Sequence, residues 1–259
     1  MEPNVDPKNI VGSIIKAAKL LESFSADRRE VTLGEFTRDV GLNKTTTYRL
    51  LQTLVTVDLL VRTRSGGYRL GKKVLYLGAI ARADLDLRNE ALPLMRDLTD
   101  EFGDTAFLML PSTEGAVVIE ALVGRNPVRV HGVTVGTVLP YHVAAGPAVI
   151  AAFDPVIEAR TLDSLRAKMT PRTLTTKKAL QSRYEEIRKS GYAISTEDYI
   201  DDVAAVGAPV LDENGIAIAS LSLGGPANRF VEPLTSTMIS KLQWAANELG
   251  NRMLDSVPS

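Results

Sequence analysis

The sequence predicts an α+β fold with two domains, in which three helices and a β-hairpin are followed by a connecting helix and a mixed α/β domain. The 259 residues exceed the length of one average domain, and no internal repeat divides them. Apolar residues recur at helical spacing near the N-terminus, whereas strand-like runs and helical patterns alternate later in the chain. These patterns predict domain boundaries at residues 1–71, 72–89 and 90–259.

The composition excludes several classes of protein. The apolar fraction of 45% and the charged fraction of 24% are those of an ordinary globular protein. The absence of cysteine excludes disulfides and thiol nucleophiles, and with two histidines a metal site would need mainly carboxylates. Met1–Pro7 lacks the layout of a signal peptide, and the nearly apolar stretch Val143–Phe153 is too short to cross a bilayer. We therefore expect a cytoplasmic protein with no cofactor, no metal and no membrane contact.

The charge is unevenly distributed along the chain. Residues 1–72 contain 12 Lys and Arg against 8 Asp and Glu, a difference of +4, and the remainder has 18 against 23, a difference of −5. This asymmetry favours contact between the N-terminal domain and a polyanion.

The first two helices are indicated by spacing and by caps. Apolar residues from Ile10 to Phe24 fall on one helical face, formed by Ile10, Ile14, Ala17, Ala18, Leu21 and Phe24. Thr32 is a predicted N-cap for Leu33–Val40, and Glu35 completes a capping box. Gly41 then supplies the left-handed residue that ends this second helix.

A third helix and a hairpin complete the N-terminal domain. Asn43 is a predicted cap for Lys44–Asp58, whose inward-facing residues are predicted to be Leu50, Leu51, Leu54 and Val57. Leu59–Thr63 and Tyr68–Leu70 are predicted strands around a Ser-Gly-Gly turn. Three helices followed by a hairpin form a winged helix-turn-helix, in which the third helix enters the major groove of double-stranded DNA.

The polar residues of the third helix and the hairpin suit contact with DNA. Lys and Arg bind phosphates or guanine edges, while Thr is short enough to touch base edges or thymine methyl groups. The predicted DNA-contacting residues are Lys44, Thr45, Thr46, Thr47, Tyr48, Arg49, Arg62, Arg64 and Arg69. The alternative is a solvated amphipathic helix whose charges only maintain solubility. The joint occurrence of a capped helix, an acid-free first turn and an arginine-bearing hairpin favours DNA binding.

The rest of the chain predicts a connecting helix and a mixed α/β domain. Helical spacing from Lys73 to Glu101 is broken by Pro93, so we expect the connecting helix to end near Asn89. The predicted strands are Ala106–Leu110, Val117–Leu122, Val128–Val130, Ala208–Asp212 and Ile216–Leu223. The predicted helices are Ala144–Phe153, Lys177–Ser190 and Thr235–Met253. A Glu-Asn-Gly turn at residues 213–215 predicts a hairpin between the last two strands.

These residues also carry a resemblance to a known family. GLNKTTTYRLLQTL at residues 41–54, followed by GYRLG at 67–71, resembles the IclR family of bacterial transcriptional regulators. Further similarity lies at residues 103–105, 191–193, 208–212 and 220–226. The resemblance implies a GAF-like effector-binding domain, homodimerisation through the DNA-binding and linker regions, and in many members pairing of dimers into tetramers.

The resemblance also implies a ligand site. The family binds its effector near a Leu-Pro-x-His loop, here Leu139–His142, and near the last strands. The implied effector-binding residues are His142, Ala144, Ala145, Gly146, Ser195, Ala205, Ser222 and Gly224. We expect His142 and Ser222 to line one cavity with residues 144–146.

Several of these positions depart from the family pattern. Pro147 stands where a basic residue is common, Ser195 where many members have Asp, Ala205 where many have Cys and Gly224 where some have Ser. Fewer fixed polar groups imply a less polar ligand or recognition through backbone groups. Without the resemblance, His142 is interpreted as a hydrogen-bonded loop residue. The acidic segment at residues 195–202 is interpreted as a solvated loop rather than a metal site.

The sequence is compatible with three functions. The favoured one is a repressor that binds a partly palindromic operator as a dimer and responds to a small organic or aromatic acid. An enzyme would need an activated nucleophile, a base with an orienting partner or a metal, and the sequence shows no such constellation. Gly224–Pro226 also lacks the Lys-Ser/Thr of a phosphate loop. A regulator whose second domain only dimerises would have a closed core without a pocket.

Overall fold

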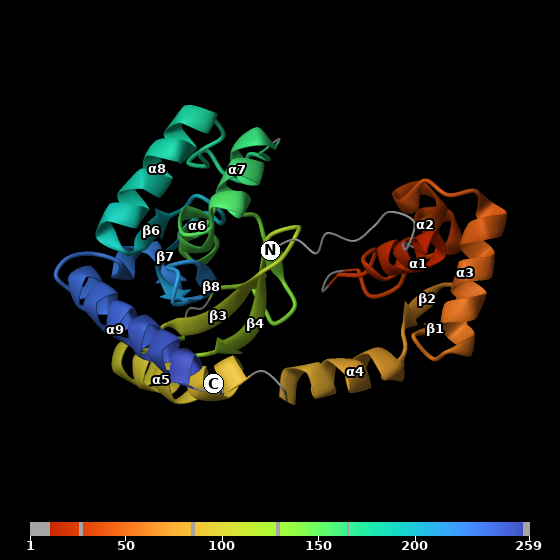
Figure 1. The fold of residues 1–259 in the computed structure, drawn as a ribbon, viewed down its shortest axis with the longest axis horizontal. Coiled ribbons are helices and arrows are strands. Elements are labelled where there is room, and N and C mark those ends of the chain that lie inside the picture. The colour runs from red at the N-terminus through yellow and green to blue at the C-terminus, as the bar shows by residue number, and fades with distance from the viewer. Residues whose placement is uncertain (1–10, 26–27, 84–85, 128–129, 165, 256–259) are drawn as a thin grey trace. The chain divides into compact units, whose positions relative to one another are not determined.

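The computed structural model describes residues 11–25, 28–83, 86–127, 130–164 and 166–255. The chain divides into two compact units, residues 1–84 and 85–259. The elements of the N-terminal unit are α1 (Gly12–Leu21), α2 (Leu33–Val40), α3 (Lys44–Thr56), β1 (Leu60–Arg62), β2 (Tyr68–Leu70) and α4 (Lys72–Ala83) (Figure 1). The predicted winged helix-turn-helix is therefore confirmed.

Side-chain caps fix the ends of the two helices of the turn. The Thr32 hydroxyl accepts the Glu35 N–H at 3.4 Å, and the Glu35 carboxylate accepts the Thr32 N–H at 2.7 Å, which completes the predicted capping box. Gly41 is left-handed with φ 67°, and the Asn43 amide oxygen accepts the Thr46 N–H at 2.8 Å. These local bonds satisfy helix-end donors and hold the angle between α2 and α3.

The core of the N-terminal unit is small and differs in part from the predicted face. Leu20, Phe36, Leu51, Leu54 and Tyr68 are buried in one cluster. Three predicted inward residues are instead exposed, namely Ala18, Ile14 at 67% and Val57 at 39%, and Ile10 of the same predicted face lies outside the described residues. The α1 prediction was wrong at Ile14, because a ten-residue helix with apolar side chains on several sides does not define its inner face by spacing alone.

The helix is not interrupted at Pro93 as expected. α4 ends at Ala83, and α5 (Asp86–Phe102) begins before Pro93 and continues through it. Pro93 is the eighth residue of α5, beyond the first turn, so it removes one intrahelical hydrogen bond without ending the helix.

The C-terminal unit is built on one six-stranded antiparallel sheet in the order β5-β4-β3-β8-β7-β6. Its strands are β3 (Thr105–Pro111), β4 (Ala116–Leu122), β5 (Val138–Leu139), β6 (Ala193–Thr196), β7 (Val203–Leu211) and β8 (Ala217–Pro226). Its helices after α5 are α6 (Ala145–Ala152), α7 (Pro155–Asp163), α8 (Lys177–Ser190), the 3-10 turn η2 (Ala227–Arg229) and α9 (Leu234–Asp255). This mixed architecture confirms the predicted GAF-like α/β domain.

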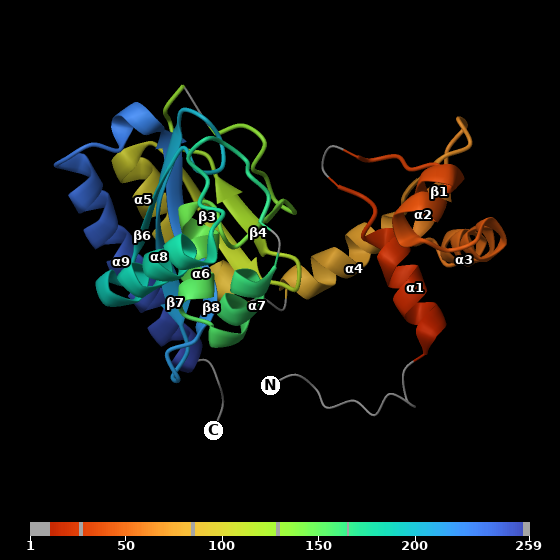
Figure 2. The ribbon, with the colours of Figure 1, turned by 90° about the horizontal axis from the view of Figure 1, so that it is seen from above.

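Helices cover both faces of this sheet, as Figure 2 shows. α5 and α9 pack on one face, where Leu108, Leu221 and Leu242 belong to one core cluster. α6 and α8 lie over the other face, where Met109, Val149 and Tyr184 belong to a second cluster. The sheet is thus buried on both sides, as its near-continuous apolar strands require.

Several short elements were not predicted. The sequence prediction missed β5, α7 and β6, and it began β7 at Ala208 although the strand begins at Val203. The predicted strand Val128–Val130 includes residues 128–129, which lie outside the described residues. The predicted turn at residues 213–215 is confirmed between β7 and β8, with Gly215 at φ 74°.

Two kinds of feature are absent from the described residues. None of the helices in the described ranges has the length and apolar character needed to span a membrane. Within the same ranges, no group of three or more His, Asp or Glu side chains is arranged to hold a metal ion.

Candidate functional site

The N-terminal end of α3 presents a polar, acid-free surface. Lys44, Thr45, Tyr48 and Arg49 are exposed, and Thr46 is half-buried. Thr45, Tyr48 and Arg49 are spaced by three and four residues and therefore share one face of the helix. This is the part of a recognition helix that reaches base edges and phosphates in a major groove.

Thr47 was also predicted to contact DNA, and here the prediction was wrong. Its side chain is fully buried, and its hydroxyl donates to the Asn43 carbonyl oxygen at 3.0 Å. Thr47 lies four residues before Leu51 and seven before Leu54, so it faces the core with them. Thr47 therefore supports α3 from within and does not face DNA.

The hairpin carries three exposed arginines, Arg62, Arg64 and Arg69. Within the described residues, neither Arg62 nor Arg64 has an acidic partner within ion-pair distance. Arg69 is different, because its guanidinium lies 2.9 Å from the carboxylate of Glu30. The three predicted wing contacts are therefore not equivalent.

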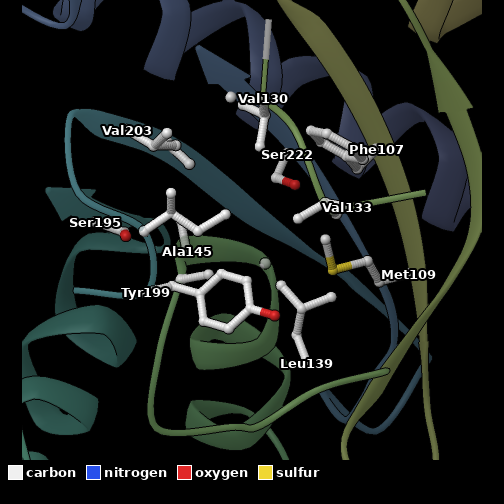
Figure 3. Close-up of a pocket in the computed structure, with 15 residues that line it drawn as sticks. Phe107, Met109, Val130, Val133, Leu139, Ala145, Ser195, Tyr199, Val203 and Ser222 are labelled. Atoms are coloured by element: carbon white, nitrogen blue, oxygen red, sulfur yellow. The ribbon is translucent and has the colours of Figure 1, made fainter. Parts of the chain in front are cut away.

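The C-terminal unit contains a small pocket between the sheet and the start of α6, with a cavity volume of about 40 Å³ (Figure 3). This volume is well below the range of about 300–1,000 Å³ that is typical of occupied small-molecule sites, so binding of a ring-sized ligand requires the pocket walls to move apart. Seven residues implied by the resemblance line it: Ala144, Ala145, Gly146, Ser195, Ala205, Ser222 and Gly224. The other lining residues are Phe107, Met109, Val130, Val133, Leu139, Tyr199, Ile200 and Val203. The walls are thus mainly apolar, with few polar groups.

Close backbone packing brings the start of α6 to this pocket. Ala144, the N-cap of α6, has φ 55°, an unusual conformation for a residue with a side chain. A Cβ at Gly207 would lie 2.8 Å from the carbonyl carbon of Ala145, so glycine on β7 allows the helix start to approach the sheet. The first N–H groups of a helix have no intrahelical acceptor and carry its positive dipole end.

A buried ion pair holds this helix start. Asp198 Oδ2 lies 2.7 Å from Arg183 on α8, and the two side chains are 7% and 12% exposed. Asp198 Oδ1 accepts the Ala144 N–H at 2.9 Å and the Ser195 hydroxyl at 2.6 Å. The interpretation of residues 195–202 as a solvated loop was therefore wrong for Asp198. The Ser195 hydroxyl donates to this carboxylate rather than into the pocket.

His142 does not line the pocket, which contradicts the expectation that it shares a cavity with Ser222. Its side chain is buried, and Nε2 lies 2.9 Å from the Ala167 carbonyl oxygen. Burial lowers the pKa of His142, and the hydrogen bond to Ala167 opposes this shift. The geometry instead fits the interpretation of His142 as a hydrogen-bonded loop residue.

Sequence reasoning also missed part of the pocket. Phe107 and Met109 on β3 contribute to the same wall as Ser222, and Phe107 pairs directly with Ser222 in the sheet. Figure 3 shows Tyr199 on the opposite side from Phe107. Alternation along β3 indicates that residues 107 and 109 share a face, but the register that places them beside β8 is a tertiary feature.

Comparison with known proteins decides the family. Residues 79–251 match the domain described as Bacterial transcriptional regulator IclR C-terminal, and residues 13–64 match the IclR helix-turn-helix domain. The chain belongs to the IclR family. It is a transcriptional regulator with a helix-turn-helix DNA-binding domain, and the relatives that it matches are named as regulators rather than enzymes.

Members of the IclR family resemble the chain over most of its length. It is 30% identical over 220 residues to the glycerol operon regulatory protein of Streptomyces griseus, covering 85% of this chain and 86% of that protein. The structure of an IclR regulator from a Silicibacter species superposes with a TM-score of 0.87 at 26% identity, covering 95% and 98% of the two chains. An IclR homolog from Microbacterium hydrocarbonoxydans, solved in complex with 4-hydroxybenzoate, has a TM-score of 0.77 at 24% identity and coverage of 94% and 100%. At that identity the likeness shows the fold alone.

Proposed function

We propose that this regulator is a repressor that binds a partly palindromic operator as a homodimer. A small organic or aromatic acid in the pocket of the C-terminal unit changes its affinity for DNA. DNA binding is assigned to residues 1–71, coupling to residues 72–89 and effector binding to residues 90–259.

The pocket is the observation that carries the effector assignment. Phe107, Leu139 and Tyr199 supply apolar and aromatic walls suited to a ring. The start of α6, at Ala145 and Gly146, supplies backbone donors and a positive dipole end for a carboxylate. No Lys, Arg or His lines the pocket among the described residues. A monoanion held by backbone groups therefore fits better than a highly charged ligand.

Exposed apolar side chains support a dimer. Ile14 on α1 is 67% exposed, and Leu75 and Tyr76 on α4 are 77% and 66% exposed. Isolated exposed apolar residues are common, but large ones clustered on a helix favour a protein contact. A two-fold pair would present two recognition helices to two half-sites. Two such dimers can pair into a tetramer, and a measurement of the mass in solution distinguishes the tetramer from the dimer.

The effector assignment is tested with two serines of β8. Ser222 lines the pocket, whereas Ser220 lies two residues earlier on the same strand and does not line it. Both side chains are buried, so Ser222→Ala and Ser220→Ala are matched in residue type and burial. The assay is DNA binding by fluorescence anisotropy with and without small aromatic acids, with 4-hydroxybenzoate as the first probe.

We expect an acid that raises the melting temperature also to change DNA affinity, because binding to the native state stabilises it. Ser222→Ala should weaken this response and leave DNA affinity without ligand unchanged, and Ser220→Ala should respond like the parent. Equal weakening by both substitutions, or by neither, would place the ligand elsewhere.

A further inference from the structure

The carboxylate of Glu30 is the centre of a hydrogen-bond cluster at the wing. Its Oε1 accepts the hydroxyl of Thr63 at 2.8 Å and the hydroxyl of Ser65. Its Oε2 lies 3.0 Å from Nε and 2.9 Å from the terminal nitrogen of Arg69. Both oxygens are therefore occupied, and the hydrogen bond from Ser65 lowers the pKa of Glu30 more than any other contact.

The backbone beside Glu30 is also tied to the hairpin. Val31 exchanges two backbone hydrogen bonds with Tyr68, at 3.0 and 2.9 Å, and so adds a third short segment beside β2. A Cβ at Gly67 would lie 2.7 Å from Oε1 and 2.9 Å from Cγ of Glu30. Glycine at this position lets the carboxylate reach the turn. The loop before α2 and the wing thus form one unit.

This arrangement places a negative charge on a hairpin that must approach phosphates. Nε and one terminal nitrogen of Arg69 both contact the same oxygen of Glu30, so one edge of the guanidinium is engaged and its positive charge is balanced by the carboxylate. The Arg69–Glu30 pair therefore attracts a phosphate less than an arginine without an acidic partner does. Arg62 and Arg64 have no such partner among the described residues.

We infer that Glu30 is a positioning residue that fixes the wing and keeps Arg69 as its counterion, so that Arg62 and Arg64 are the phosphate-binding residues of the hairpin. The inference deepens the proposed DNA contact and rests on it. It differs from the prediction that all three wing arginines contact DNA, and the experiment below distinguishes the two.

The test counts phosphate contacts from the dependence of DNA affinity on salt. Each phosphate contact contributes about 0.9 to the slope of log affinity against log salt concentration, and because a homodimer carries each substitution twice, the changes below are given per bound protomer. The probe is a mixed-sequence DNA duplex, and the proteins are the parent, Glu30→Gln, Arg69→Gln and the double variant, with Arg64→Gln as the matched control. Glutamine at position 30 keeps an acceptor oxygen for the two hydroxyls but removes the charge.

Arg64→Gln should make the slope shallower by about 0.9, whereas Arg69→Gln should leave it at the parent value. Glu30→Gln releases Arg69 and should make the slope steeper by about 0.9, and the double variant should return it to the parent value. If Arg69→Gln matches Arg64→Gln, Arg69 contacts phosphate and the inference is overturned. If the thermal melt shows that Glu30→Gln does not fold, the comparison of Arg69→Gln with Arg64→Gln is sufficient to test the inference.

Failure of the proposed DNA contact looks different. In that case Arg64→Gln, Arg69→Gln and Arg49→Gln would all keep the parent slope, which would overturn the proposed function and this inference together.

Discussion

Replacing Asp198 by alanine is expected to destabilise the C-terminal unit by about 3–5 kcal/mol, the usual cost of removing one partner of a buried ion pair. The pair qualifies because the Asp198 and Arg183 side chains are 7% and 12% exposed and lie 2.7 Å apart. The substitution also removes the acceptor of the Ala144 N–H and of the Ser195 hydroxyl. The loss should therefore loosen the start of α6 as well as leave the Arg183 charge without a partner.

Urea unfolding monitored by circular dichroism measures this effect. A loss of this size corresponds to a fall in melting temperature of roughly 6–20 °C for a domain of this length. Asp198→Asn keeps an acceptor oxygen without the charge, and it should lie between the parent and Asp198→Ala. The control is Asp201→Ala, since Asp201 is exposed in the same segment and should change stability by no more than about 0.5 kcal/mol. Equal unfolding midpoints for Asp198→Ala and Asp201→Ala would refute the reasoning.

Three further predictions concern other parts of the chain. Because burial lowers the pKa of His142 in the folded state, its contribution to stability should be complete above about pH 6.5 and fall below it as the unfolded state takes up protons first. His142→Gln should flatten this fall in chemical unfolding measured across pH, and an unchanged profile would contradict the assignment. Gly207→Ala should cost about 1–3 kcal/mol, because its Cβ would meet backbone of Ala145 at 2.8 Å, and a neutral result in thermal melts would show that the helix start moves freely. Leu75→Glu should convert dimers to monomers in analytical ultracentrifugation. Val123→Glu, at a position 54% exposed in the C-terminal unit, should not. Equal masses for both variants would show that α4 is not part of the dimer interface.

The N-terminal unit was largely predictable because its signals are local. The capping box of Thr32 and Glu35, the left-handed Gly41 and the Asn43 cap each act within four residues, so the sequence contains the whole interaction. Thr47 was wrongly assigned to the DNA-contacting surface because it lies within the polar run at the start of α3. Its position four residues before Leu51 already indicates the buried face.

The pocket was predictable only in part. The resemblance brought seven correct lining residues together, but it did not exclude His142, whose partner is the Ala167 carbonyl oxygen 25 residues away. The buried state of Asp198 depends on Arg183, which an acidic run in the sequence does not reveal. β5 has two residues, too few for an alternating pattern to predict a strand.

The most direct test of the groove-facing helix end is DNA binding by Lys44→Gln/Arg49→Gln across a range of ionic strengths. Both side chains are exposed at the start of α3. Lys178 is exposed on α8, and Lys178→Gln is the control that removes one positive charge away from the DNA-binding domain. If both side chains contact phosphates, the double variant should bind more weakly and show a slope shallower by roughly 1.8 per bound protomer, while the control keeps the parent affinity. Parent-like affinity and slope in the double variant would contradict the assignment of α3 as the DNA-reading helix.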